Sequence, residues 1–198
     1  MGDVHGCADE LGKLVHLAQP SRVVLVGDLF TKGPKPRETW QWIERLGAEA
    51  VLGNHDAGML ARPERHASMQ LPPEAWAWLA QRPLTLEVGD WTVVHAGLDP
   101  NRGKAGTTRS TALVVRRWPD DTDVRHPFWF ELWPGPERVI YGHDAIRGLQ
   151  DHRPRTLGID TGCVYGGRLT GYLVETDVLI SVPAARAYRP VEGPAPVP

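Results

Sequence analysis

The chain has 198 residues and a formal net charge of −2 at pH 7, with 41% apolar and 23% charged residues. This composition is typical of a soluble globular protein, and it argues against a strongly basic nucleic-acid-binding protein or a disordered chain. The length suits a single hydrophobic core. We therefore expect one domain over residues 1–185 and a disordered tail over residues 186–198, which end in the proline-rich stretch "RPVEGPAPVP".

No segment approaches the roughly 20 continuous apolar residues of a membrane span, and no export signal precedes Asp3. We therefore expect a cytoplasmic protein with no membrane partner and no stable binding of nucleic acid. The two cysteines, Cys7 and Cys163, are too few for a disulfide framework and are expected to be small buried thiols.

Helix and strand patterns alternate in the first half of the chain. "DELGKLVHLA", residues 9–18, places its apolar residues on one helical face, and "RVVLVGD", residues 22–28, is typical of a buried parallel strand. A second helix is predicted over residues 36–46, between an initial proline and Gly47. "EAVLGNHD", residues 49–56, then repeats the strand pattern.

This order predicts a shared edge for the polar residues that follow the strands. Parallel strands need a crossover of a dozen or more residues, and the intervals between Asp3, Asp28 and Asn54 each accommodate a helix with its turns. The three side chains should therefore emerge at one edge of a sheet, where open α/β sheets bind ligands.

The second half changes from α/β to β structure. A helix is predicted over residues 72–82, a hairpin with a Gly-Asp turn over 84–97, and a further helix over 107–118. "RVIYGHD", residues 138–144, reads as another strand that ends in polar residues. Residues 156–182 alternate strand and turn in the manner of antiparallel structure.

Five segments share one pattern, an apolar run next to glycine and a side chain able to bind a metal: "GDVHG", "VGDLFTKG", "LGNHD", "VVHAG" and "YGHD". Together they supply Asp3, His5, Asp28, Asn54, His95 and His143. Such oxygen and imidazole ligands suit two divalent ions such as Mn, Fe or Zn. Asp28 would be the natural bridging ligand between ions about 3.5–4 Å apart, a spacing that suits in-line attack on phosphorus.

The ordered blocks GD-x-HG, GD-x4-G, GNH[DE], H-x-G and GH resemble the phosphoprotein phosphatase superfamily of metallophosphoesterases, from residue 2 to about residue 182. Within it the chain is most similar to bacterial diadenosine tetraphosphatases and ApaH-like phosphatases. "GDLFTKGP" and "IDTGCVYGGRLTGYLVE" carry this closer likeness. The resemblance implies an α/β (α+β) fold, a calcineurin-like β-sandwich flanked by helices, with the active site in loops at the carboxyl ends of the strands.

The resemblance also implies roles for individual residues. One metal would be held by Asp3, His5 and Asp28, and the other by Asp28, Asn54, His95 and His143. The expected ions are two Mn, with Fe or Zn as alternatives. A hydroxide bridging them would be the nucleophile. His55 would protonate the leaving oxygen as general acid, and Asp56 would orient its imidazole.

Phosphate binding is expected to involve Lys32 and an arginine. Lys32 stands where the wider family has an arginine, and an ammonium group neutralises a phosphate without gripping two of its oxygens. A second cation is therefore required. Arg116 and Arg117 are both placed like the next phosphate-binding arginine of the family, and the sequence does not say which one points inward.

The segment "RRWPDDTDVRHPFWFELWPGP", residues 116–136, is rich in proline, charge and aromatic residues and should not form a regular element. We expect a loop over the site that governs substrate choice. An aromatic side chain in it would either stack on a nucleobase or anchor the loop, and both readings stay open.

Two functions fit these residues. The first is a dimetal hydrolase of dinucleoside polyphosphates or capped RNA ends, with a small nucleotide as substrate. The alternative is a phosphoprotein phosphatase, acting on Ser/Thr or Tyr, with the same metal chemistry and a phosphorylated protein as partner. A binding module with a degenerate metal site is disfavoured because every ligand position is filled.

The position of Asp3 and His5 at the start of the sequence raises one more expectation. A ligand turn needs a buried strand in front of it to hold its side chains still. We therefore expect the native chain to begin upstream of Met1. The alternative is a sheet that lacks one central strand and holds its first metal loosely.

Overall fold

The computed structural model describes residues 1–190. Its α-helices are α1 (Ala8–Ala18), α2 (Pro36–Leu46), α3 (Asn54–Ala61), α4 (Pro73–Ala80), α5 (Gly103–Gly106) and α6 (Arg109–Val114). Its strands are β1 (Val24–Leu25), β2 (Glu49–Ala50), β3 (Thr85–Val88), β4 (Trp91–Val94), β5 (Arg138–Tyr141), β6 (Gln150–His152), β7 (Thr156–Gly158), β8 (Arg168–Leu173) and β9 (Val178–Pro183). Short 3₁₀ helices are η1 (Pro63–Met69), η2 (Trp129–Glu131), η3 (Ala145–Arg147) and η4 (Cys163–Tyr165).

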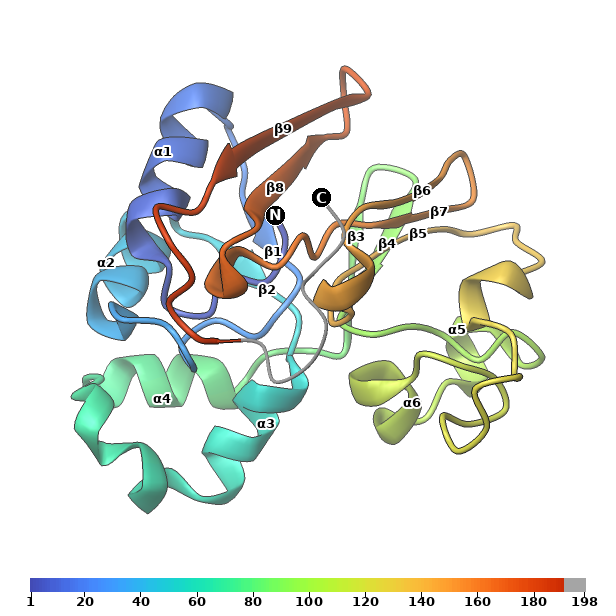
Figure 1. Ribbon diagram of the computed structural model, residues 1–198, viewed down its shortest axis with the longest axis horizontal. Helices are drawn as coiled ribbons and strands as arrows, with labels where there is room; N and C mark the ends of the chain where they lie inside the picture. Colours follow the sequence, from blue (N-terminus) through green and yellow to red (C-terminus); the bar gives the residue numbers. More distant parts are fainter. Residues whose placement is uncertain (191–198) are drawn as a thin grey trace.

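The elements are arranged in layers (Figure 1). Helix α1 packs on the β8–β9 hairpin and α2 packs on α1. The sheet that contains β3 to β7 lies next to that hairpin, and α5 and α6 lie beyond the sheet. None of the helices within residues 1–190 is both long and apolar enough to cross a membrane.

The strand pairing confirms the expected antiparallel structure only at the end of the chain, because β7, in the segment expected to be antiparallel, pairs in parallel with β5. Strands β1 and β2 pair in parallel, and β8 and β9 are antiparallel. The larger sheet has the order β3-β4-β5-β7-β6, in which β4, β5 and β7 run parallel. The predicted hairpin is β3–β4, with Gly89 in its turn at a φ of 59°. The carboxyl ends of β4, β5 and β7 therefore lie at one edge of this sheet.

Local sequence signals explain where the elements end. Helix α2 starts with Pro36, whose missing N–H is not needed in the first turn, and stops at Gly47. Gly47 has a φ of 55°, a left-handed conformation that favours glycine, and its N–H donates to the carbonyl groups of Glu44 and Ile43.

Apolar side chains fill the spaces between the layers. Leu11 and Leu14 of α1 pack with Leu169 and Val182 of the β8–β9 hairpin. Val93, Ile140, Leu157 and neighbouring residues form a second cluster between that hairpin and the larger sheet. A third cluster lies on the α6 side of the sheet and contains Val94, Val139, Tyr141, Ala112 and Trp129. Burial on both faces explains why these strands are continuous apolar runs.

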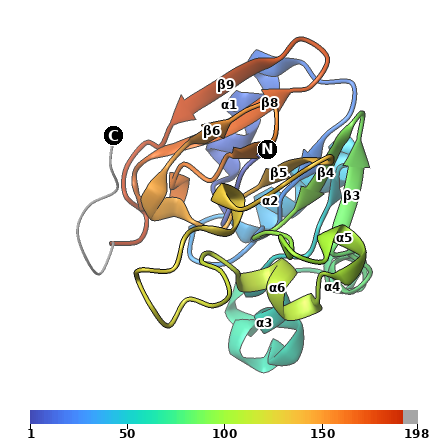
Figure 2. The same cartoon turned by 90° about the vertical axis from the view of Figure 1, so that its right-hand side faces the viewer.

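The structure shows what two of the aromatic residues in segment 116–136 do. Trp129 and Trp133 are each only 1% exposed, and the Trp133 indole N–H donates to the carbonyl of Glu137 at 2.8 Å. These two tryptophans therefore anchor the loop and are not free to stack on a nucleobase. Figure 2 shows the loop running beside α6 before the chain returns to β5.

The first residues of the chain lie between β1 and β8. The amino group of Met1 donates to the carbonyl of Val24 at 2.7 Å, and the N–H of Gly2 donates to that of Thr170 at 2.8 Å. Hydrogen bonds on both sides thus position the turn that carries Asp3.

At the other end, residues 186–190 of the expected tail contact the folded body. The N–H groups of Tyr188 and Arg189 donate to the carbonyl of Val164 at 2.9 and 3.0 Å. The Tyr188 hydroxyl donates to Glu10 Oε1 at 2.8 Å. The remainder of the expected tail, residues 191–198, lies outside the described residues.

Candidate metal centre

All six expected metal ligands converge at one edge of the sheets. Each of four of them follows a strand within a few residues: Asp28 after β1, Asn54 after β2, His95 after β4 and His143 after β5. Asp3 and His5 join them because the His5 N–H donates to the carbonyl of Asp28 at 2.8 Å. The carboxyl ends of parallel strands are where α/β sheets bind ligands, so the predicted shared edge is observed.

The carboxylate of Asp28 lies at the centre of the cluster. Its Oδ2 is 3.5 Å from His5 Nε2, and its Oδ1 is 3.6 Å from His95 Nε2. The residue is only 2% exposed. One oxygen therefore faces each imidazole, which is the arrangement that a carboxylate bridging two cations requires.

The other ligands extend the network on the His95 side. Asn54 Oδ1 lies 2.9 Å from His95 Nε2 and 3.1 Å from His143 Nδ1. The Asp3 carboxylate accepts from the backbone N–H of His143, at 3.3 Å to each oxygen. Ligand atoms of Asp3, Asp28 and His95 all lie within 4.8 Å of one another, and so do those of His5, Asp28 and His55. The two groups share Asp28, although Asp3 here groups with His95 and not with His5.

Burial sets the charge state of these groups. It raises the pKa of Asp28 to about 7 and raises the pKa of Asp3 well above its usual value, with help from nearby carboxylates. Burial lowers the pKa of His95 to about 4 and that of His143 to about 2, and it lowers the pKa of His5 well below its usual value. The imidazoles are therefore neutral, the form that binds metals.

The residues fit divalent cations. His143 Nε2 is buried and has no hydrogen-bond partner among residues 1–190, so a lone pair or N–H is left unsatisfied in the cluster. Positive charge between Asp3 and Asp28 would offset the cost of burying two carboxylates together. Imidazole nitrogen with carboxylate and amide oxygen is a donor set for Mn, Fe or Zn.

Close packing explains why glycine precedes several ligands. A Cβ atom on Gly142 would lie 2.1 Å from Asp3 Oδ1 and 2.6 Å from a methyl carbon of Val26. A Cβ on Gly53 would lie 2.2 Å from Asp28 Oδ1. Glycine is therefore needed at these positions because one ligand turn packs directly on the next.

The ligand turns also contain strained backbone. His5, Asp28 and His143 have φ values of 45°, 53° and 73°, in the left-handed region that residues with a Cβ rarely adopt. Lys32, beside the cluster, has a φ of 68°. Strain of this kind persists where the surrounding structure holds it, and it gathers at functional sites.

We expect Gly142→Ala to lower the affinity for Mn²⁺ by about 10–100-fold, because the new methyl group would displace the Asp3 carboxylate. Calorimetric titration with Mn²⁺ measures this change. Gly58→Ala is the control: Gly58 lies inside α3 with nothing within 4 Å of the added Cβ, so Mn²⁺ affinity should be unchanged. Equal Mn²⁺ affinity in Gly142→Ala and the parent protein would contradict this explanation of the motif.

His55 lies beside the cluster as expected, whereas Asp56 does not contact the His55 imidazole. The His55 side chain is 38% exposed and its Nε2 is 4.0 Å from Asp28 Oδ2, so it borders the cluster. Asp56 is fully buried and accepts from the N–H groups of Asp28 at 2.7 Å, Leu29 at 3.0 Å and Gly53 at 3.1 Å. Within the described part of the chain no hydrogen bond joins Asp56 to His55. Asp56 instead holds the Asp28 loop, since adjacent helical residues point in different directions.

Burial and nearby cations lower the pKa of His55 to about 4, with Lys32 the largest cationic influence. The imidazole is therefore neutral near pH 7 before an anion binds. Burial also raises the pKa of Asp56 to about 7, and the neighbouring Asp28 acts in the same direction. The two groups thus respond to the same low-dielectric surroundings in opposite ways.

A cavity of about 570 Å³ opens over the cluster and contains two of the expected phosphate-binding cations. Lys32 and Arg116 line it, and Arg116 lies 3.7 Å from Asp144 at its wall. Arg117 does not line this cavity: it donates to the carbonyl of His126 and its guanidinium carbon lies 4.1 Å from the Phe128 ring centre. The structure therefore brings Arg116, and not Arg117, to the site.

Several lining residues were not anticipated from the sequence. Asp160, which follows β7, is 5% exposed, and burial together with Asp28 raises its pKa to about 7. The strand-then-acid pattern in "TLGID" could have indicated it. His66, Tyr165 and Arg189 also line the cavity, whereas residues 118–136 do not. The expectation that this loop covers the site is therefore wrong: its buried tryptophans hold it on the α6 side.

Known proteins are similar to this chain in sequence and fold. The sequence matches the calcineurin-like phosphoesterases over residues 1–171. The symmetrical bis(5'-nucleosyl)-tetraphosphatase of Vibrio parahaemolyticus is 29% identical, over 86% of this chain and 92% of that protein. The asymmetrical bis(5'-nucleosyl)-tetraphosphatase PrpE of a Geobacillus species is 28% identical, over 96% of this chain and 95% of that protein.

Solved structures agree with the sequence matches. A protein provisionally named a diadenosine tetraphosphatase superimposes with a TM-score of 0.86 and 34% identity, over 92% of this chain and 91% of that one. A metallophosphoesterase from Sphaerobacter thermophilus, at 19% identity and a TM-score of 0.57, shares the fold. The predicted family fold is confirmed. The chain belongs to the calcineurin-like phosphoesterase family and is a hydrolase of phosphoester or phosphoanhydride bonds.

Proposed function

We propose that the protein is a dimetal-dependent hydrolase that cleaves a phosphoanhydride bond in dinucleoside polyphosphates or related nucleotides. The observation that carries this proposal is the Asp28 carboxylate, which presents one oxygen to His5 and the other to His95 under a cavity lined by Lys32 and Arg116. The similarity to both symmetrical and asymmetrical tetraphosphatases supports a nucleotide substrate.

Asp3, His5, Asp28, Asn54, His95 and His143 would hold the two cations, for which we propose Mn, with Fe or Zn as alternatives. When bound, the cations acidify a water molecule into a nucleophile and neutralise phosphate charge, so no phosphoenzyme is needed. Lys32 and Arg116 supply further positive charge for the phosphate oxygens. Asp56 keeps Asp28 in place through three backbone N–H groups.

His55 is the proposed general acid. It lines the cavity and is the half-exposed imidazole nearest Asp28, so a bound phosphate can reach it. A phosphate anion beside the ring raises the pKa of His55 and favours the imidazolium form, which then protonates the leaving oxygen.

The proposal is tested with the Mn-loaded protein and a panel of diadenosine tetraphosphate, capped RNA, phosphoserine peptide and phosphotyrosine peptide. We expect hydrolysis of diadenosine tetraphosphate, with ADP as the product of symmetrical cleavage or AMP and ATP as those of asymmetrical cleavage, separated by chromatography. Hydrolysis of the peptides alone would overturn the nucleotide proposal in favour of a phosphoprotein phosphatase.

The cytoplasm is the proposed location. Cys7 and Cys163 are both buried and unpaired, as expected for thiols kept in a reducing compartment. Fractionation of cells that express the untagged protein tests this, and recovery with the membranes or outside the cell would contradict it.

A further inference from the structure

A second cavity adjoins the metal site. It has a volume of about 400 Å³ and shares Thr31, Asn54, His55 and His66 with the larger cavity over the metal cluster. Its outer part is formed by Arg62 and Arg65, at the end of α3 and in η1. We call this cavity the arginine pocket. It is continuous with the metal site and extends the space that a substrate can occupy.

The arginines of this pocket carry free positive charge. Arg62 and Arg65 are both exposed, and within residues 1–190 neither takes part in an ion pair. Some other arginines are neutralised, for example Arg138 by Asp90 at 2.7 Å and Arg153 by Asp151 at 2.6 Å, whereas Arg62 and Arg65 are distinguished by lining one cavity together. Two unpaired guanidinium groups in one concavity attract an anion, and guanidinium binds phosphate oxygens in pairs.

His55 lies where the two cavities meet, because it lines both. In the proposed reaction His55 protonates the leaving oxygen, so the leaving group must lie on the His55 side of the reacting phosphorus. The arginine pocket opens on that side, because His55 lines it whereas His5, Asp28 and His143 line only the larger cavity. Whatever is attached to the leaving oxygen therefore extends toward Arg62 and Arg65.

We propose that the arginine pocket is the leaving-group subsite and binds the phosphates of a nucleoside di- or triphosphate as it departs. This inference rests on the proposed function. It identifies the part of the site that would favour a polyphosphate substrate over a phosphate monoester. In the reaction the water oxygen bonds to phosphorus while the bond from phosphorus to the leaving oxygen breaks. That oxygen takes the proton of His55, and the proton lost by water returns to the imidazole through solvent.

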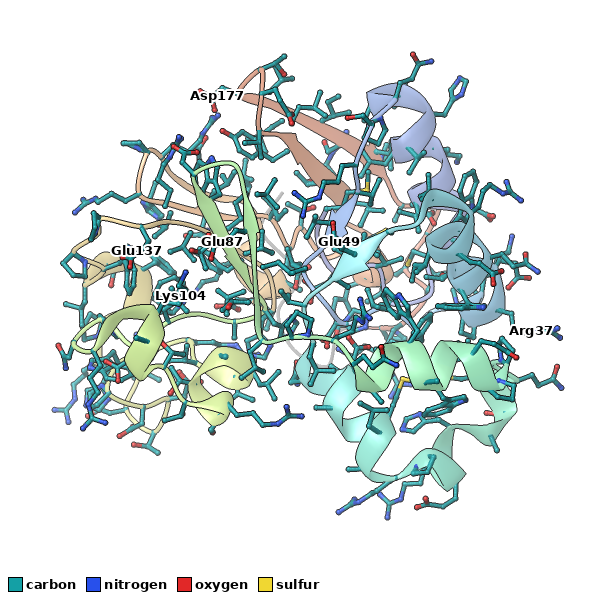
Figure 3. All side chains as sticks on the ribbon, turned by 180° about the vertical axis from the view of Figure 1, so that it is seen from behind. Arg37, Glu49, Glu87, Lys104, Glu137 and Asp177 are labelled. Atoms are coloured by element: carbon teal, nitrogen blue, oxygen red, sulfur yellow. The ribbon has the colours of Figure 1, made fainter. Side chains whose placement is uncertain are left out.

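The test compares the double variant Arg62→Gln/Arg65→Gln with Arg37→Gln. Arg37 is an exposed arginine of α2 outside the cavities described above, and Figure 3 shows it at the outer edge of the molecule. We expect kcat/KM for diadenosine tetraphosphate to fall by about 10–100-fold in the double variant, as lost charge-assisted hydrogen bonds predict. Turnover of p-nitrophenyl phosphate, whose leaving group carries no phosphate, should change by less than about 3-fold. Arg37→Gln should change neither.

An equal effect of the double variant on both substrates, or no effect on either, would overturn the subsite. Calorimetric binding of inorganic tripolyphosphate to the Mn-loaded protein gives a readout that does not depend on turnover. The subsite predicts weaker binding by the double variant and intermediate binding by Arg62→Lys/Arg65→Lys, which keeps the charge but not the paired donors. If the unmodified protein cleaves only monoesters, the proposed function fails, while unchanged tripolyphosphate binding in the variants identifies failure of the subsite alone.

Discussion

Asp28→Asn is expected to lower hydrolysis of every phosphate substrate by on the order of 10³-fold and to reduce the bound Mn from two ions to one or none. Loss of a neighbour that merely orients a ligand costs roughly 10–100-fold, and Asp28 contacts both halves of the cluster, so its loss should cost more. The substitution keeps the shape of the side chain but removes the charge that lies between His5 and His95. Steady-state kinetics and elemental analysis after dialysis measure the two effects.

The matched control is Asp9→Asn. Asp9 is exposed on α1 and pairs with Lys35 at 2.7 Å, a surface ion pair of the kind that contributes little to stability. Its loss should leave both metal content and turnover unchanged. An Asp28→Asn protein that retains two Mn ions would show that the carboxylate does not bridge them.

His55→Asn is expected to lower kcat by about 10²–10⁴-fold for phenyl phosphate, the usual contribution of a general acid. Phenol has a pKa of about 10, so the phenolate leaving group is a strong base and its departure depends on a proton donor. For p-nitrophenyl phosphate, whose leaving group is a far weaker base, the loss should be less than about 10-fold. A proton donor predicts this difference between substrates, whereas a residue that only binds substrate does not.

His55 lies close enough to the cluster to be a metal ligand, because ligand atoms of His55, His5 and Asp28 lie within 4.8 Å of one another. The metal content of a His55 variant distinguishes this role from that of a general acid. We expect the Mn content of His55→Asn to equal that of the parent protein. His16→Asn, at an exposed position on α1, is the matched control for loss of an imidazole. Equal losses of kcat for the two phenyl phosphates, or loss of a metal ion, would contradict the proposed role.

The sequence was sufficient to identify the candidate metal ligands that the fold brings together. The strand patterns before Asp28 and Asn54 predicted that these two residues and Asp3 share one sheet edge, because the carboxyl ends of parallel strands meet there. The glycines of the ligand motifs are also visible in the sequence. Gly53 and Gly142 are required because one ligand turn packs directly against the next. Local pattern and long-range packing point to the same residues here.

Other features depend on contacts that no local pattern encodes. Arg116 and Arg117 are neighbours of the same type, and the contacts of Arg117 with His126 and Phe128 turn it away from the site. Asp56 stands beside His55 in the chain but is directed by its helix to the backbone of the Asp28 loop.

The chain order of glycines, carboxylates and imidazoles thus establishes the kind of chemistry, because ligand type and strand spacing are local properties. The shape of the cavities around the cluster depends instead on how distant segments pack. Arg116 and Asp160 line one cavity, and Arg62 and Arg65 line the other. Side-chain direction at a surface depends on which neighbours fill the space around it, and those neighbours are known only once the chain has folded.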